Sequence, residues 1–183
     1  MSRGAALDLW LGNLIGIGGT VLGTLSLLAI STAQYPLYDG ILLGISWISL
    51  WYFPHCLIHY ILGTIVGIKF TGYWLGKSSI QHLPHRILKT IGQLTPVLII
   101  RIDHDHSRSS PRWGWILMYT GGAVASMTLP LIVSIMSFMK VDLILAVLAF
   151  GAALVNIAFT AYFSPIVGDI SRAVTIHRQR NAT

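Results

Sequence analysis

The chain contains no glutamate, so every acidic group available for chemistry is an aspartate. Charged residues make up only 10% of its 183 residues, whereas a soluble domain usually has about a quarter, which excludes an ordinary soluble globular domain. A single cysteine, Cys56, excludes an internal disulfide and a cysteine-rich metal site. The basic residues are not interleaved with aromatic stacking residues, so nucleic acid is not an expected partner.

Long apolar runs dominate what is present. Hydrophobic residues make up 54% of the chain, and the mean hydropathy is +0.71. A helix needs roughly 20 apolar residues to cross a bilayer. We therefore expect an all-α, polytopic integral membrane protein with a single domain, residues 1–183. Its transmembrane helices are expected at about residues 9–33, 41–68, 113–139 and 143–168.

The remaining segments are a polar loop at about residues 69–112 and a basic C-terminal tail at residues 172–183. Residues 92–102 of the loop are apolar but too short to span a bilayer, which favours a cytoplasmic re-entrant or interfacial segment. The tail is expected to be mobile. Pro54 interrupts the second span, and either a kinked helix or a helix beginning near Pro54 is compatible with it.

Positive charge is distributed very unequally between the two predicted sides of the bundle. Of the 12 Lys and Arg residues, only Lys140 falls on the side away from the termini. Cytoplasmic loops of membrane proteins carry an excess of Lys and Arg, so both termini and the long loop are expected to be cytoplasmic, in the cell (plasma) membrane. The net charge of +6 is then explained by this asymmetry and by contact with anionic membrane lipids.

Glycine is concentrated in the first span. Gly12-x-x-x-Gly16 and Gly19-x-x-x-Gly23 place small residues one turn apart, which allows another helix to approach closely. This pattern predicts close packing within the bundle, or docking to a membrane-protein partner or a second copy through these glycine-rich faces.

His55 and His59 are the strongest candidates for chemistry. They lie in a segment without charged residues, and positions i and i+4 share a helix face, so both imidazoles can bind one metal ion. Asp169 follows the last span at its cytoplasmic end. Two imidazoles and one carboxylate form an ordinary zinc-binding set with a fourth position left for water. We therefore predict a metal site formed by His55, His59 and Asp169, with zinc as the expected metal.

The same residues also allow interpretations without a metal. His55 and His59 can be sheltered by aromatic neighbours and hydrogen-bonded to other helices. Asp169 can form an ion pair with Arg172, or cap a helix that begins at Ile170.

Further residues extend the pattern along the chain. Residues 53–63 surround the histidine pair, residues 112–126 open the third span with small residues, and Asn156 and Gly168-Asp169 lie in the last span and at its end. Over residues 53–173 this order resembles the integral-membrane zincins, which are site-2-protease-like metallopeptidases. The resemblance implies that the histidine pair lies on the equivalent of the family's His-Glu-x-x-His helix and that the last aspartate is the third zinc ligand.

Cys56 is where the chain departs from that family. The resemblance places it at the position of the glutamate that acts as the family's general base, and no glutamate exists elsewhere to replace it. Proton transfer by a positioned group typically contributes about 10²–10⁴-fold to a rate. Conventional proteolysis is therefore not expected, and no residue is assigned a catalytic role.

Three functional classes follow from these observations. The first is a catalytically impaired, intramembrane zinc-metallopeptidase-like protein, a pseudoenzyme acting as a structural or regulatory membrane subunit. The second is an active membrane metallohydrolase with an unusual general base. The third is an accessory subunit of a larger membrane complex that binds haem, chlorophyll or iron through its histidines. The loop contains the histidines His82, His85, His104 and His106. Such a cluster resembles the histidine clusters of membrane di-iron enzymes, although no two of these histidines are adjacent in the sequence.

Overall fold

The computed structural model describes residues 5–30, 36–78, 89–90 and 96–178. Within these ranges, four helices are long and apolar enough to cross a membrane, as expected. They are followed by the short helix α6, and the five helices have these bounds: α1 (Leu9–Ala29), α2 (Pro36–Ile65), α4 (Arg112–Ser137), α5 (Leu143–Val167) and α6 (Asp169–Arg178).

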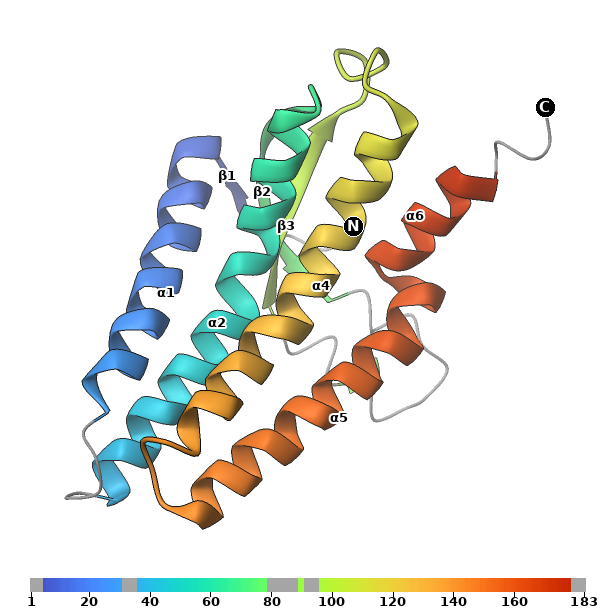
Figure 1. Ribbon diagram of the computed structural model, residues 1–183. Coiled ribbons are helices and arrows are strands. Elements are labelled where there is room, and N and C mark those ends of the chain that lie inside the picture. Colours follow the sequence, from blue (N-terminus) through green and yellow to red (C-terminus); the bar gives the residue numbers. More distant parts are fainter. Residues whose placement is uncertain (1–4, 31–35, 79–88, 91–95, 179–183) are drawn as a thin grey trace.

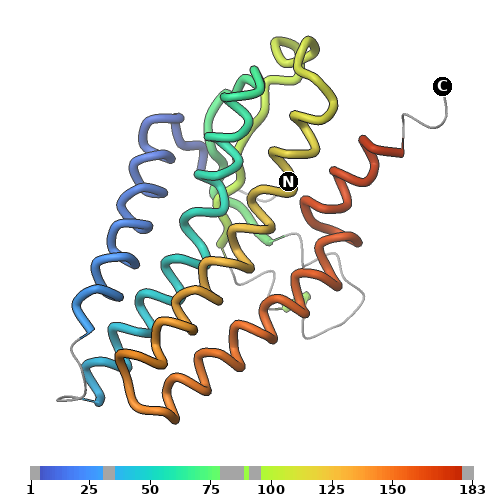
Figure 2. Tube along the Cα trace, viewed as in Figure 1, coloured from blue at the N-terminus to red at the C-terminus, as the bar shows by residue number. Residues whose placement is uncertain are grey.

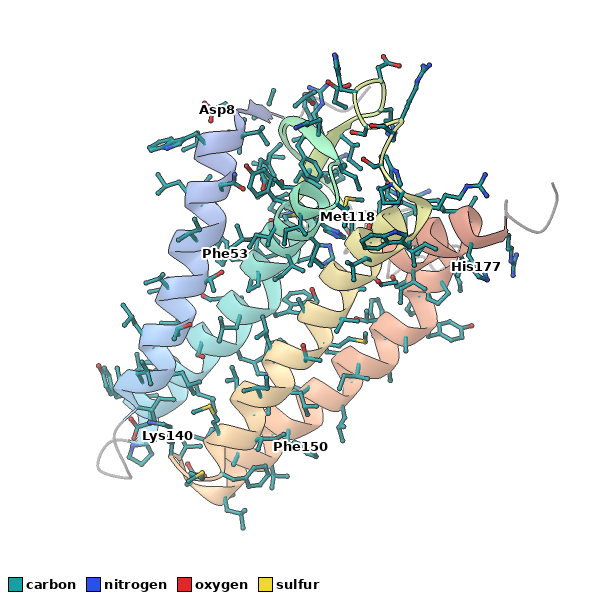
Figure 3. The ribbon with its side chains drawn as sticks, turned by 45° about the horizontal axis from the view of Figure 1, so that its top comes forward. Asp8, Phe53, Met118, Lys140, Phe150 and His177 are labelled. Atoms are coloured by element: carbon teal, nitrogen blue, oxygen red, sulfur yellow. The ribbon has the colours of Figure 1, made fainter. Side chains whose placement is uncertain are left out.

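The four long helices run side by side, with α2 and α4 at the centre (Figure 1). The chain trace in Figure 2 shows α1 and α5 on opposite flanks of this central pair. Two of the aspartates are N-caps of long helices. Asp8 accepts a hydrogen bond from Leu11 N at the start of α1, and Asp142 accepts one from Ile144 N at the start of α5. Asp8 and Lys140 lie at opposite ends of the bundle (Figure 3).

The all-α expectation is wrong in one respect, because the structure contains a three-stranded antiparallel sheet in the order β1-β2-β3. Its strands are β1 (Ala5–Leu7), β2 (Lys69–Lys77) and β3 (Pro96–Asp103). β3 contains most of the apolar run that was expected to be re-entrant. A run of eight residues rich in Val and Ile suits a strand that pairs with β2 better than it suits an isolated segment.

β2 contains a β-bulge beside β1. The pairing of β2 with β3 shifts between Phe70 and Gly72, and Gly72 has a φ of 151°. A Cβ at Gly72 would lie only 2.6 Å from the carbonyl oxygen of Leu7 in β1. Glycine at this position therefore allows β1 to approach the bulge.

Two further expectations are settled by the helices. α2 runs continuously through Pro54, so no new helix begins there. The prediction of a mobile tail is wrong for residues 172–178, because they belong to α6 and continue it to its end at Arg178. Burial of Ala173 and packing of Ile176 hold this segment against the body of the protein.

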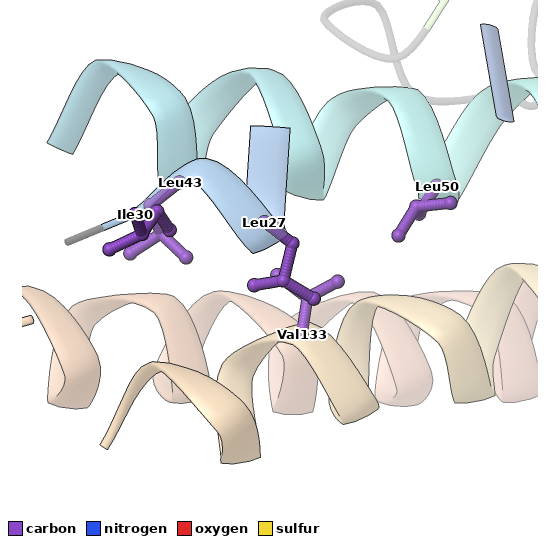
Figure 4. Close-up of a cluster of buried hydrophobic side chains, with 5 residues drawn as sticks. All are labelled: Leu27, Ile30, Leu43, Leu50 and Val133. Atoms are coloured by element: carbon purple, nitrogen blue, oxygen red, sulfur yellow. The ribbon is translucent and has the colours of Figure 1, made fainter. Parts of the chain in front are cut away.

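Two apolar clusters hold the helices together. The first joins α1, α2 and α4 through the side chains drawn in Figure 4: Leu27, Ile30, Leu43, Leu50 and Val133. The second joins the turn after α2 to α4 and α6 and contains Val66, Ile68, Met118, Tyr119 and Ala173. This cluster packs the middle of α6 against α4.

The glycine-rich face of α1 packs inside the chain. A Cβ at Gly19 would overlap the ring of Phe53 in α2, and a Cβ at Gly12 would overlap the ring of Tyr73 in β2. The close helix packing that the glycine spacing predicts is therefore made with α2 and β2.

Candidate metal centre

Three side chains from two distant parts of the sequence converge at one point. His55 and His59 project from adjacent turns of α2, and their Nε2 atoms lie 3.2 Å apart. Asp169, the first residue of α6, places its Oδ2 3.1 Å from His55 Nε2 and 3.3 Å from His59 Nε2. The structure thus brings together all three residues that the sequence predicts as metal ligands.

The hydrogen bonds on the far side of each ring determine which nitrogen faces the centre. His59 Nδ1 lies 2.7 Å from the carbonyl oxygen of Met118, and His55 Nδ1 lies 3.0 Å from that of Gly122. A carbonyl oxygen can only accept, so both Nδ1 atoms carry the proton in these bonds. In the neutral imidazoles, both Nε2 atoms therefore direct a lone pair toward Asp169.

α4 is shaped to receive the two histidines. A Cβ at Gly122 would overlap the His59 ring, so glycine provides the space that this ring occupies. Ser126 Oγ lies 2.9 Å from His55 Nδ1, and Asn156 Nδ2 of α5 donates to the Ser126 carbonyl at 2.8 Å. The resemblance drew attention to Asn156 and to the small residues of α4, but the sequence did not identify Gly122 and Ser126 as groups that support the histidines.

The junction between α5 and α6 positions the side chain of Asp169. α5 stops at Gly168, and the new helix is fixed by a hydrogen bond from Ile170 N to Ser164 Oγ at 3.2 Å. Arg172 lies over the Tyr119 ring, 5.7 Å from its centroid. Asp169 therefore faces the two histidines, while Arg172 packs on an aromatic ring.

The centre is partly open. The His59 side chain is only 5% exposed, whereas those of His55 and Asp169 are 31% and 22% exposed. Burial raises the pKa of the Asp169 carboxyl, but His55 and His59, when protonated, outweigh this effect through hydrogen bonds and positive charge and hold that pKa well below its usual range. The centre is therefore most accessible at His55.

Cys56 lies beside the centre without belonging to it. Its side chain is buried, and Sγ donates to the carbonyl oxygen of Leu98 in β3 at 2.8 Å. Cys56 is not part of the group of ligand atoms that His55, His59 and Asp169 form.

The other histidines within the described residues lie elsewhere. His104 stacks on Trp115 with ring centroids 5.7 Å apart, and His177 lies in the exposed last turn of α6. His106 bonds Asp103, and its backbone N–H and ring hold the pKa of Asp103 below its ordinary value. His82 and His85 lie outside the described residues.

Over the part of the chain that the structure describes, the His55–His59–Asp169 group is the one cluster of side chains suited to a metal ion. No protein-family model matches the chain, and neither a curated protein nor a solved structure matches it.

Proposed function

We propose that this chain is an integral membrane protein that binds zinc through His55, His59 and Asp169. In this proposal it is a catalytically impaired counterpart of the intramembrane zinc metallopeptidases and acts as a structural or regulatory membrane subunit. The observation that carries the proposal is the convergence of two imidazole lone pairs and one carboxylate on a single point.

The distances between these atoms fit a zinc ion. Nitrogen and oxygen ligands bind zinc at about 2.0–2.1 Å, so two ligands of a tetrahedral site lie about 3.3 Å from each other. The three separations here are 3.1, 3.2 and 3.3 Å. Because all three atoms are acceptors in the neutral state, they repel one another unless a cation lies between them.

The backbone carbonyl groups of α4 orient both histidine rings in the way that metal-binding histidines usually require. Ligating histidines usually donate their other ring N–H to a carbonyl or carboxylate, which fixes the ring and its tautomer. His55 and His59 both do so, toward Gly122 and Met118. A bound zinc ion would act as a Lewis acid and lower the pKa of a bound water molecule to about 7.

The catalytic impairment follows from Cys56. Hydrolysis by the intramembrane zinc metallopeptidases needs a carboxylate base beside the first histidine, and this chain has a thiol there. That thiol is buried and donates a hydrogen bond to the Leu98 carbonyl oxygen. A group that donates to a backbone oxygen is not placed to accept a proton from a reacting water molecule.

The membrane setting rests on the four apolar helices. α5 is the most apolar of them, and most of its surface is exposed in the isolated chain. Lipid or a membrane-protein partner would cover this surface. The strong excess of Lys and Arg at one end supports a cytoplasmic location for both termini and for the metal centre.

Metal analysis of the purified protein tests the proposal. About one zinc per chain is expected, and His55→Ala or Asp169→Ala should lose it. His106→Ala and Asp105→Ala are matched controls, because both residues are exposed and distant from the centre in sequence. Wild-type protein without zinc, or variants that retain it, would refute the proposal.

A further inference from the structure

The outer edge of β3 is closed by side chains of the metal-binding helix. β3 is at the edge of the sheet, and its inner side pairs with β2. Leu98 N donates to the Tyr52 hydroxyl at 3.1 Å, and that hydroxyl donates to the carbonyl oxygen of Pro96, also at 3.1 Å. Cys56 Sγ donates to the Leu98 carbonyl. Both backbone groups of Leu98 are therefore bonded to α2.

Exposed backbone groups at a sheet edge usually pair with another strand or are covered. Here a phenol and a thiol, one turn apart on α2, cover them. We call Tyr52, Cys56 and their bonds to β3 the latch. A thiol is a weak donor, so the latch is weaker than a pair of strands would be.

The latch and the metal ligands occupy the same two turns of α2. Cys56 directly follows His55, and Tyr52 lies one turn before it. The ligands face α4 and α6, whereas the latch faces β3. A metal ion that fixes this part of α2 also fixes the two side chains on which β3 depends.

We propose that occupancy of the metal centre controls the outer edge of β3 through the latch, so that metal binding closes the edge and metal loss loosens it. This inference rests on the proposed function, because it needs a metal at His55, His59 and Asp169. It gives Cys56 a positive role: the thiol at the place of the missing base connects the centre to the sheet.

Coupling between two sites is reciprocal. If metal binding lowers the equilibrium constant for opening of the latch by some factor, a closed latch must strengthen metal binding by the same factor. Coupling of this kind typically amounts to about 5- to 150-fold. The coupling can therefore be measured in two ways, as the effect of zinc on amide exchange in β3 and as the effect of the latch on zinc affinity.

Amide hydrogen exchange resolved at Leu98, with and without zinc, tests the coupling in the full-length protein in detergent. Zinc should slow exchange at Leu98 about fivefold or more in the wild type. Tyr52→Phe removes only the hydroxyl and should abolish this difference. Tyr38→Phe, at an exposed position on the same helix, is the matched control and should behave as wild type.

Cys56→Ala breaks the other half of the latch and provides a second test. It should weaken zinc binding by about the factor by which zinc slows exchange at Leu98 in the wild type, and Cys56→Ser should restore part of the zinc affinity and of the zinc-dependent protection. Bound zinc with unchanged exchange at Leu98 would overturn the coupling and leave the metal centre intact. Absence of bound zinc would overturn both. If zinc still slowed amide exchange at Leu98 in Tyr52→Phe, the latch would not be the connection between the metal centre and β3.

Discussion

Asp169 Oδ2 lies 3.3 Å from His59 Nε2, although the two residues are 110 positions apart in the sequence. The contact joins the start of the last helix to the middle of the second. With His59 neutral and protonated at Nδ1, its Nε2 has no hydrogen to donate to Asp169 Oδ2, so no hydrogen bond explains the approach. A cation bound between them, as in the proposed metal centre, would favour this approach.

Gly122→Ala should weaken zinc binding about 10- to 100-fold, the usual cost of disturbing the groups that orient a metal ligand. The added Cβ would overlap the His59 ring and displace its Nε2. Zinc titration of the apoprotein measures the effect. Gly151→Ala is the control, because a Cβ there meets nothing within 4 Å. Equal affinity in the two variants would contradict the proposed position of His59.

Zinc-loaded wild-type protein should hydrolyse casein no faster than His55→Ala, because no base is positioned beside the first histidine. The comparison is made in the same detergent with the same zinc concentration. Metal-dependent cleavage that His55→Ala abolishes would instead establish the active hydrolase with an unusual general base.

Gly19→Ala should destabilise the bundle by about 1–3 kcal/mol, the usual cost of overpacking, because its Cβ would overlap the Phe53 ring. Gly18→Ala is the neighbouring control and meets nothing within 4 Å. It should stabilise α1 by about 0.5–1 kcal/mol, the ordinary gain from replacing glycine in a helix. Thermal unfolding in detergent distinguishes the two. Similar midpoints would mean that α1 does not pack on α2 through this face.

The proposed orientation is tested by labelling with a membrane-impermeant thiol reagent in a Cys56→Ala background. Met139→Cys is adjacent to Lys140 and highly exposed, whereas His177→Cys lies in the exposed last turn of α6. On intact cells, the first should be labelled and the second should not. The reverse pattern would place the termini and the metal centre on the outside.

The sequence was sufficient to predict the four apolar helices and the three candidate ligands. Length and the absence of charge specify an apolar helix locally, and the spacing of His55 and His59 places them on one face whatever surrounds them. Asp169 could be predicted only through its position after the last span and through the resemblance to a family.

The sheet could not be predicted with the same means. β3 is a short apolar run, and such a run fits a strand, a buried helix segment or a re-entrant segment equally well until its partner is known. The partner, β2, is distant in sequence and contains a bulge at Gly72. The support for the histidines was also hidden, because it comes from backbone carbonyls of Met118 and Gly122, which any residue type can supply.

Zinc K-edge X-ray absorption of the metal-loaded protein would identify the ligands of the zinc ion. We expect nitrogen and oxygen neighbours at about 2.0–2.1 Å, with the outer-shell scattering of two imidazole rings and no sulfur neighbour. A sulfur neighbour at about 2.3 Å would show that Cys56 binds the metal, and fewer than two imidazoles would show that His55 and His59 do not share it. Either result would contradict the centre described above.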